Sequence, residues 1–281
     1  MPALQSLLRL SFQRLVKRRL VLVGIIILGA LVVLSALAPQ IETQDPYQLS
    51  EDVLARPNAR HYFGTDPLGR DLYSRVLAGG RYTLSVGLGT IGLGMLFGLP
   101  LGLWSGFRGG RWDQLLMRGM DVLLSFPDIL LALALMAALG TSLQNAMLAL
   151  AILYVPKFAR VMRASTLVER EKDYVAAARA LGCPPWRVLF VHLLPNGFAP
   201  VVVVATLSLG SAIVSIAALG FLGLGAQPPL PEWGALLSQG KDYYTTDPHL
   251  MLFPGLALAL TVLAINLLGD GLRDALDVRQ L

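Results

Sequence analysis

The chain has 281 residues, of which 55% are hydrophobic and 15% are charged, with a formal net charge of +5. Soluble domains carry roughly 45–50% apolar and about 25% charged residues, so this composition excludes an ordinary soluble domain and indicates a membrane protein. The single cysteine excludes a disulfide framework within the chain, none of the four lysines is followed by the Ser or Thr of a Walker-type phosphate loop, and the three histidines form no metal-binding motif.

Runs with few or no charges predict the membrane spans, because a bilayer core of about 30 Å needs about 20 apolar residues in a helix. The run at 120–156 is long enough for two spans, and Gly140-Thr141-Ser142 predicts a tight hairpin between them. We therefore expect an all-α polytopic membrane protein with six transmembrane helices, drawn from runs at 20–38, 82–107, 120–156, 192–231 and 250–268.

Lysine and arginine predict the orientation of these spans, since cytoplasmic loops are enriched in both. Of the 23 basic residues, 17 fall in segments on one side, which holds both termini. We expect that side to be cytoplasmic, and the positive charge then reflects topology and not a nucleic-acid surface. The predicted organisation is listed in chain order: 1–19 cytoplasmic segment, 20–38 first transmembrane helix, 39–81 external loop, and 82–281 five-helix core with a cytoplasmic loop at 160–195.

A cleaved signal peptide is the alternative interpretation of the first 38 residues. Ala36-Leu37-Ala38 has the small-residue shape of a cleavage site. However, the apolar run before it is long enough to span a bilayer, and Pro39 is a poor residue to follow a cleavage site. We expect an anchor helix.

The end of the external loop predicts a short helix on the membrane surface. Asp66 is a candidate N-cap and Pro67 a candidate first helical residue, while Leu68, Leu72 and Val76 recur at helical spacing. This helix is either a docking surface for an external partner or a solvated connector, and the pattern alone does not separate the two.

The second span contains an uninterrupted ladder of small residues. Gly94, Gly98, Gly102 and Gly106 recur every four residues, which lets another helix approach closely. The ladder faces either a partner or moving helix, or a helix of the same subunit, and we favour packing within the subunit.

Two polar residues in the third and fourth spans are candidates for a transport pathway. Asp128 is the only acidic residue expected well inside a span, and an intramembrane carboxylate is a functional hypothesis by default. Asn145 lies near the predicted outer hairpin, where it contacts either substrate or water. Proton coupling through Asp128 is disfavoured, because a relay normally needs more than one such group.

The loop between the fourth and fifth spans predicts two short helices with a sharp bend between them. Asp173 can cap an alanine-rich helix that runs to Leu181, and Gly182 stands where a left-handed C-terminal stop belongs. Pro185 opens a second stretch, which Pro195 interrupts. A rigid protrusion with few bulky side chains is suited to insertion into a groove of another protein.

At these residues the chain resembles the membrane subunits of bacterial ATP-binding-cassette importers. Their cytoplasmic loop carries Glu-Ala-Ala, three residues, Gly, and later Ile-x-Leu-Pro. Here Ala177, Ala178 and Gly182 match, as do Leu194 and Pro195, whereas Ala176 replaces the family's Glu. The resemblance implies a type I importer permease fold and an ATPase-coupling loop formed by Asp173, Tyr174, Ala176, Ala177, Ala178, Gly182, Leu194 and Pro195.

Further motifs are similar to the dipeptide, oligopeptide and nickel branch, and most like the second, "C-type" permease of dipeptide importers. His192 stands at the Ile position of the loop motif, and the other similar segments are 63–71, 221–225, 232–234 and 269–277. The resemblance implies a permease for di- or oligopeptides in the bacterial inner membrane, with no catalytic residues, metal site or cofactor of its own. It also implies a sister permease, two ATPase subunits that bind ATP and Mg, and an external or periplasmic substrate-binding protein.

Three alternatives stay open at this point. A nickel or metal-chelate importer shares the same motifs, and its selectivity can reside in the binding protein. An ion-coupled secondary transporter predicts several ionisable groups at mid-span and inverted repeats, of which only Asp128 is present. A membrane-embedded hydrolase would need a nucleophile and a base within the spans.

Overall fold

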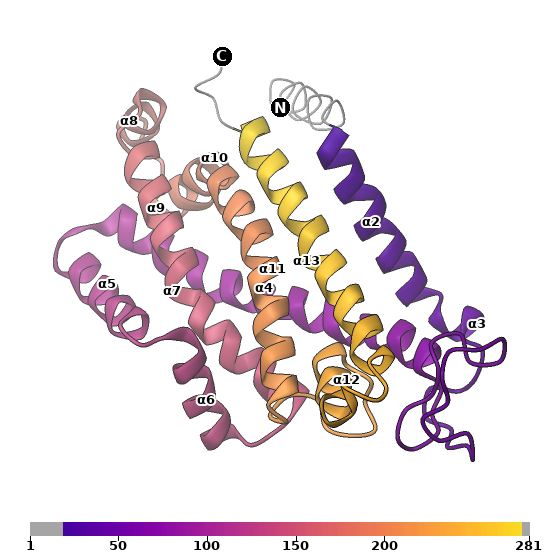
Figure 1. Ribbon diagram of the computed structural model, residues 1–281. Helices are drawn as coiled ribbons and strands as arrows, with labels where there is room; N and C mark the ends of the chain where they lie inside the picture. Colours follow the sequence, from indigo (N-terminus) through magenta and orange to yellow (C-terminus); the bar gives the residue numbers. More distant parts are fainter. Residues whose placement is uncertain (1–18, 277–281) are drawn as a thin grey trace.

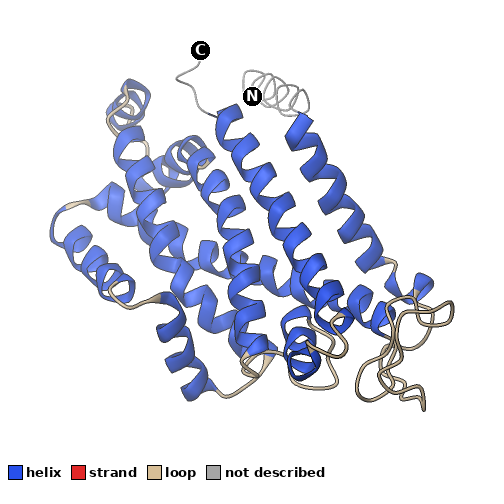
Figure 2. Ribbon diagram, in the orientation of Figure 1, coloured by secondary structure: helices blue, strands red, loops and turns tan. Residues whose placement is uncertain are grey.

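The computed structural model describes residues 19–276, in which the regular elements are all helices and an isolated bridge joins Thr65 and Asp71 (Figure 2). The predicted segment 1–19, apart from Arg19, and the last five residues lie outside the described residues. The elements are α2 (Arg19–Ala36), α3 (Ala38–Ile41), α4 (Leu72–Arg108), α5 (Gly110–Leu124), α6 (Asp128–Leu139), α7 (Leu143–Glu169), α8 (Asp173–Ala180), α9 (Pro185–Arg187), the π-helix η1 (Val188–Leu193), α10 (Leu194–Gly197), α11 (Ala199–Phe221), α12 (Trp233–Gly240), the 3₁₀ turn η2 (Lys241–Tyr243) and α13 (His249–Leu276).

The predicted count of six spans is met when one broken span is included. Within residues 19–276, five helices are long and apolar enough to cross a membrane: α2, α4, α7, α11 and α13. Helices α5 and α6 together pass the same test, but they are bent by 91° at Ser125-Phe126-Pro127. Proline lacks an N–H and disfavours helical geometry in the residue before it, so this break has a local cause.

The break corrects the placement of Asp128. The sequence suggested a carboxylate well inside a continuous span, whereas Asp128 is the first residue of α6, directly after the bend. Pro127 occupies the N-cap position and provides no side-chain hydrogen bond to the helix. The carboxylate therefore sits at a helix end, where a negative charge is favourable next to the helix dipole.

The long helices lie side by side, with α4 running obliquely behind α11 and α13 (Figure 1). Helix α8, the start of α2 and the end of α13 lie at the upper end of this view, and the hairpin between α6 and α7, the helix α12 and the 42–71 segment lie at the lower end (Figure 1). The loop predicted to be cytoplasmic is thus at the opposite end from the loops predicted to be external.

The glycine ladder packs against α7 of the same chain, as favoured from the sequence. A methyl group added at Gly98 would lie 2.7 Å from the carbonyl oxygen of Val155, and one added at Gly102 would overlap the carbonyl oxygen of Ala159. Gly94 and Gly106 meet α7 in the same way. Only glycine allows the backbones of α4 and α7 to come this close.

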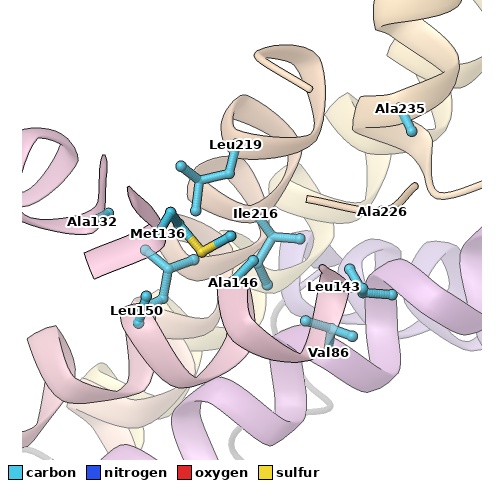
Figure 3. Packing of buried hydrophobic residues seen from close by; sticks show 11 residues of the cluster. Val86, Ala132, Met136, Leu143, Ala146, Leu150, Ile216, Leu219, Ala226 and Ala235 are labelled. Carbon is cyan, nitrogen blue, oxygen red and sulfur yellow. The ribbon is translucent and has the colours of Figure 1, made fainter. Parts of the chain in front are cut away.

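One buried hydrophobic cluster joins α6 and α7 to α4, α11 and α12 (Figure 3). Met136, Ala146 and Leu219 are at most 1% exposed. This cluster ties the hairpin to the body of the molecule. Its core members are Val86, Ala132, Met136, Leu143, Ala146, Ala149, Leu150, Ile216, Leu219, Ala226 and Ala235.

The short surface helix predicted around Asp66 is wrong. The Asp66 carboxylate accepts hydrogen bonds from the backbone N–H groups of Leu68 and Arg70 and from Nε of Arg70, which makes a turn. Gly69 has φ +72°, a left-handed conformation that ends the turn. The helix begins at Leu72 with Asp71 as its N-cap and continues without a break into the span as α4.

Candidate functional site

The loop that follows α7 forms a compact protrusion made of α8, a glycine turn and the short helices α9, η1 and α10. Helix α7 ends at Glu169, and α8 begins four residues later at Asp173. Asp173 is the first residue of α8, and the N-cap is Lys172, so the predicted capping role of Asp173 is shifted by one residue. A carboxylate in the first turn still favours the helix through its dipole.

Gly182 makes the bend that the sequence predicted. Its φ of +77° is left-handed, and its N–H donates to the carbonyl of Arg179 at 3.0 Å. The next N–H, of Cys183, donates to Ala178 at 3.0 Å, so the free carbonyls at the end of α8 are satisfied. No atom lies within 4 Å of a Cβ built at Gly182, so the need for glycine here is conformational and not steric.

Helix α8 presents a smooth outer face. Val175 is 0% exposed and Ala178 8%, so these two residues form its inner side. Ala176 and Ala177 are exposed on the other side. An alanine face offers apolar surface without long side chains, which suits close contact with a second protein.

Large apolar side chains elsewhere in the protrusion are also exposed. Leu181 is 86% exposed and Trp186 62% exposed, and Phe190 and Val191 are exposed as well. Leu194, half-buried, and Pro195, exposed, begin α10. All eight residues predicted for the coupling loop thus belong to this one protrusion, and exposed apolar side chains of this kind are typical of surfaces that contact a partner.

A small polar cluster fixes α8 relative to α7. Oε2 of Glu169 accepts a hydrogen bond of 2.7 Å from the Tyr174 hydroxyl, and Oε1 accepts one of 2.6 Å from Nζ of Lys172. Burial, together with the hydrogen bond to Glu169, raises the pKa of Tyr174 to about 12. The hydroxyl therefore stays a donor at every physiological pH. The Tyr174 ring also lies 6.3 Å from the ring of His192.

The protrusion is also attached to the end of α4. The guanidinium of Arg170 donates to the carbonyl of Gly106 at 2.7 Å, and that of Arg179 lies 5.3 Å from the centre of the Phe107 ring. Val188 and Leu193 are buried in the cluster that also holds Val175. These contacts link the protrusion to α4, and Glu169 and Arg170 link it to the end of α7.

Sequence reasoning missed Glu169 and the ion pair between Asp113 and Arg163. The role of Glu169 could have been inferred from the sequence, because Glu169 lies three residues before Lys172 and five before Tyr174. Asp113 on α5 accepts hydrogen bonds of 2.5 and 2.6 Å from Arg163 on α7, across 50 positions of sequence, and no local pattern signals this pairing.

The two predicted pathway residues, Asp128 on α6 and Asn145 on α7, lie outside this protrusion. Asn145 uses its side-chain N–H groups to bond the carbonyls of Leu139, at 2.7 Å, and Gly140, at 3.1 Å, so it fixes the hairpin between α6 and α7. Asp128 lines a cavity that α5, α6, α7 and α11 enclose. Among residues 19–276, no group of three or more His, Cys, Asp or Glu side chains is placed to hold a metal ion.

Comparison with known families identifies the chain. Residues 98–281 match the family described as "Binding-protein-dependent transport system inner membrane component", and residues 6–58 match the N-terminal TM domain of oligopeptide transport permease C. The chain belongs to this inner membrane component family. It is a multi-pass permease subunit without catalytic function of its own, and membership implies ATPase and substrate-binding partners.

Three relatives of this permease are themselves transport system permease proteins. It is 45% identical to the dipeptide transport system permease protein DppC of Alkalihalophilus pseudofirmus, over 96% of this chain and 89% of the relative. It is 45% identical to the di/tripeptide transport system permease protein DppC of Pseudomonas aeruginosa, over 90% and 86%. It is 47% identical to the glutathione transport system permease protein GsiD of Pectobacterium atrosepticum, over 79% and 73%.

The fold of the permease is that of a type I importer. A chain from an inward-facing structure of the MetNI methionine ABC transporter matches with TM-score 0.59, over 72% of this permease and 96% of that chain, at 22% identity. This likeness concerns the fold alone, and it confirms the predicted architecture.

Proposed function

We propose that this permease carries di- or oligopeptides across the inner membrane as one of two membrane subunits of an ATP-binding-cassette importer. The observation that carries the proposal is α8, a short helix with exposed alanines held at one end of the molecule by the left-handed turn at Gly182. The peptide class is supported by the relatives, because each of the three bears a name that refers to a small peptide.

The α8 protrusion couples ATP hydrolysis to movement of the spans. Two ATPase subunits bind ATP and Mg, and α8 inserts into a groove of one of them. Closure of the ATPases moves α8. The contacts of Arg170 with Gly106 and of Arg179 with Phe107 transmit this movement to α4. ATP shifts the balance between inward- and outward-open states only through the different affinity of the ATPases for the two states.

The remaining subunits complete the path. A sister permease forms a pseudo-twofold heterodimer with this chain, and an external or periplasmic protein delivers the peptide to the outer end. Both termini are cytoplasmic, which places α8 on the same side as the ATPases. The surplus of Lys and Arg in the segments at this end supports that orientation.

Affinity purification followed by reconstitution tests the proposal. The tagged permease is extracted at its native level in mild detergent, and the proteins that copurify are identified by mass spectrometry. We expect two ATPase polypeptides and a second permease. In proteoliposomes with the binding protein, the complex should take up radiolabelled peptides only in the presence of ATP.

Two results would contradict this account in different ways. Isolation of the chain alone, active in vesicles without ATP, would overturn the importer assignment. Stimulation of the assembled complex by nickel or a nickel chelate, without any response to peptides, would keep the importer and replace its substrate class.

A further inference from the structure

A cavity of about 400 Å³ opens where α6 begins after the 91° bend. Its polar lining comes from three helices: Asp128 from α6, Tyr154, Lys157 and Arg160 from α7, and Ser211 and Ser215 from α11. This volume lies within the range of about 300–1,000 Å³ that is usual for small-molecule sites. The cavity is therefore large enough to hold a ligand.

Two of the charged residues of this cavity lie far from the turn of the helical hairpin that α6 and α7 form. Lys157 is 14 residues from the start of α7 and 12 from its end, so at 1.5 Å per residue it is roughly 20 Å from either end of the helix. Asp128 is 11 residues from the end of α6 at the outer hairpin, a similar distance of about 16 Å. Both side chains are exposed in the subunit.

Neither Asp128 nor Lys157 forms a direct ion pair or hydrogen bond within the described residues. The Asp128 carboxylate forms no hydrogen bond or ion pair with another residue of the described chain. The Lys157 ammonium lies 5.8 Å from the centre of the Tyr154 ring, and Asp128 is the opposite charge that acts on it across the cavity, beyond ion-pair distance. The third charged residue, Arg160, is already paired with Asp121 at 2.5 Å.

Both residues belong to candidate membrane spans, where a charge without a direct partner is costly to expose to lipid and instead faces water, a partner chain or a ligand. One cavity that presents a carboxylate and an ammonium that are not in contact is complementary to a molecule that carries both charges. A peptide with free termini is such a molecule. Three hydroxyl groups, of Tyr154, Ser211 and Ser215, line the same space and can bond the amide groups of a peptide.

We propose that Asp128 and Lys157 form a substrate-contact site inside the membrane, in which Asp128 binds the peptide's ammonium terminus and Lys157 binds its carboxylate terminus. This inference rests on the proposed function and names the part of the peptide that the permease itself reads. The site selects for free termini and leaves side-chain selectivity to the binding protein.

The test measures peptide binding without the binding protein. The complete complex of permeases and ATPases is placed in nanodiscs, and the affinities for radiolabelled Ala-Ala, N-acetyl-Ala-Ala and Ala-Ala-amide are compared. In the native complex, blocking either terminus should weaken binding by about tenfold or more, because each block removes one charge-assisted contact.

Two variants assign each contact to its residue. Asp128→Asn should bind Ala-Ala and N-acetyl-Ala-Ala equally while still discriminating against Ala-Ala-amide. Lys157→Gln should show the reverse pattern. The matched controls, Asp242→Asn and Lys241→Gln, remove the same charges from exposed residues at η2, outside the cavity, and should leave all three affinities unchanged.

Several results would overturn the site. These are a native complex that ignores the blocking groups, variants that weaken all three peptides equally, and a native complex that binds no dipeptide at all. Equal weakening is also what a charge pair with the sister permease would give. Uptake by the native complex separates this failure from that of the proposed function: ATP-driven uptake of Ala-Ala from the binding protein persists if only the site is wrong, and is absent if the peptide function is wrong.

Discussion

The Tyr174 hydroxyl on α8 donates a 2.7 Å hydrogen bond to the carboxylate of Glu169, the last residue of α7. This contact joins α8, the helix predicted to meet the ATPase, to α7, the helix on which the glycine ladder packs. Because Lys172 binds the other oxygen of the same carboxylate, Glu169 fixes the angle between the two helices.

Tyr174→Phe removes this hydrogen bond and keeps the aromatic ring. A hydrogen bond to a charged group contributes about 1.5–3 kcal/mol of stability, here to the fixed orientation of α8 relative to α7. Without it we expect less peptide transported per ATP hydrolysed. The measurement is the ratio of uptake to ATPase rate in proteoliposomes. An unchanged ratio would show that the contact has no part in coupling.

The same hydrogen bond predicts a pH dependence. Since the pKa of Tyr174 is raised to about 12 from its ordinary value of 10, its stabilisation is complete below pH 10 and is lost only as the pH rises toward 12. The difference between the native protein and Tyr174→Phe should therefore be constant from pH 6 to pH 9. A difference that disappears within this range would contradict the assignment.

Gly182→Ala forces a side chain into a left-handed conformation. The expected cost is about 1–2 kcal/mol, enough to disorder the turn after α8 and lower coupled transport while membrane insertion stays normal. Gly119→Ala is the matched control, because a Cβ also meets nothing within 4 Å there and Gly119 is not among the residues with positive φ. Equal transport by the two variants would show that the left-handed turn at Gly182 has no role in coupling.

Gly102→Val tests the packing of α4 on α7. The side chain would overlap the backbone of Ala159, so we expect a loss of thermal stability of the purified complex, of the order of 1–3 kcal/mol or more in free energy. Gly92→Val lies on the same helix where a Cβ meets nothing within 4 Å, and it should be far milder. Similar unfolding temperatures for both variants would contradict the packing.

Glu232, buried before α12, predicts that stability falls as the pH rises. Its carboxylate accepts bonds from Thr83 at 3.1 Å and from the N–H of Ala235 at 3.0 Å, but burial outweighs them and raises its pKa above 4.5. The folded state then holds the proton more tightly than the unfolded state, so stability is lost as the pH rises above about 4.5.

Glu232→Gln removes this titration and keeps both kinds of hydrogen bond. Unfolding temperatures of the purified complex should fall with rising pH by a larger amount in the native protein than in the variant, with the difference growing from pH 4.5 upward. Parallel curves for the two proteins would show that Glu232 is not titrating.

Local features of the fold could be predicted from the sequence. The hairpin at Gly140, the left-handed stop at Gly182 and the contact surface of the glycine ladder each depend on residues close together in the chain. The structure also brings all predicted coupling residues into one protrusion, because that protrusion is a single continuous segment.

The remaining features depend on the conformation of turns or on contacts between helices, and residue spacing does not reveal either. The sequence predicted Asp66 as the N-cap, whereas the structure uses Asp71, because Asp66 pairs with Arg70 and Gly69 takes a left-handed conformation. The hydropathy of the run 120–156 does not reveal the 91° bend before Asp128, because α5 and α6 are equally compatible with one straight span. The pairing of Asp113 with Arg163 across two helices left no trace in local spacing.

A cysteine cross-linking experiment tests the central claim, that α8 contacts an ATPase subunit, most directly. The chain has one cysteine, Cys183, so Cys183→Ser gives a clean background for Ala177→Cys on the exposed face of α8 and for Thr141→Cys at the opposite end. We expect Ala177→Cys to cross-link to an ATPase subunit with an efficiency that changes on addition of ATP, and Thr141→Cys to give no such product. Absence of an ATPase cross-link from Ala177→Cys in a complex that still transports would contradict the account.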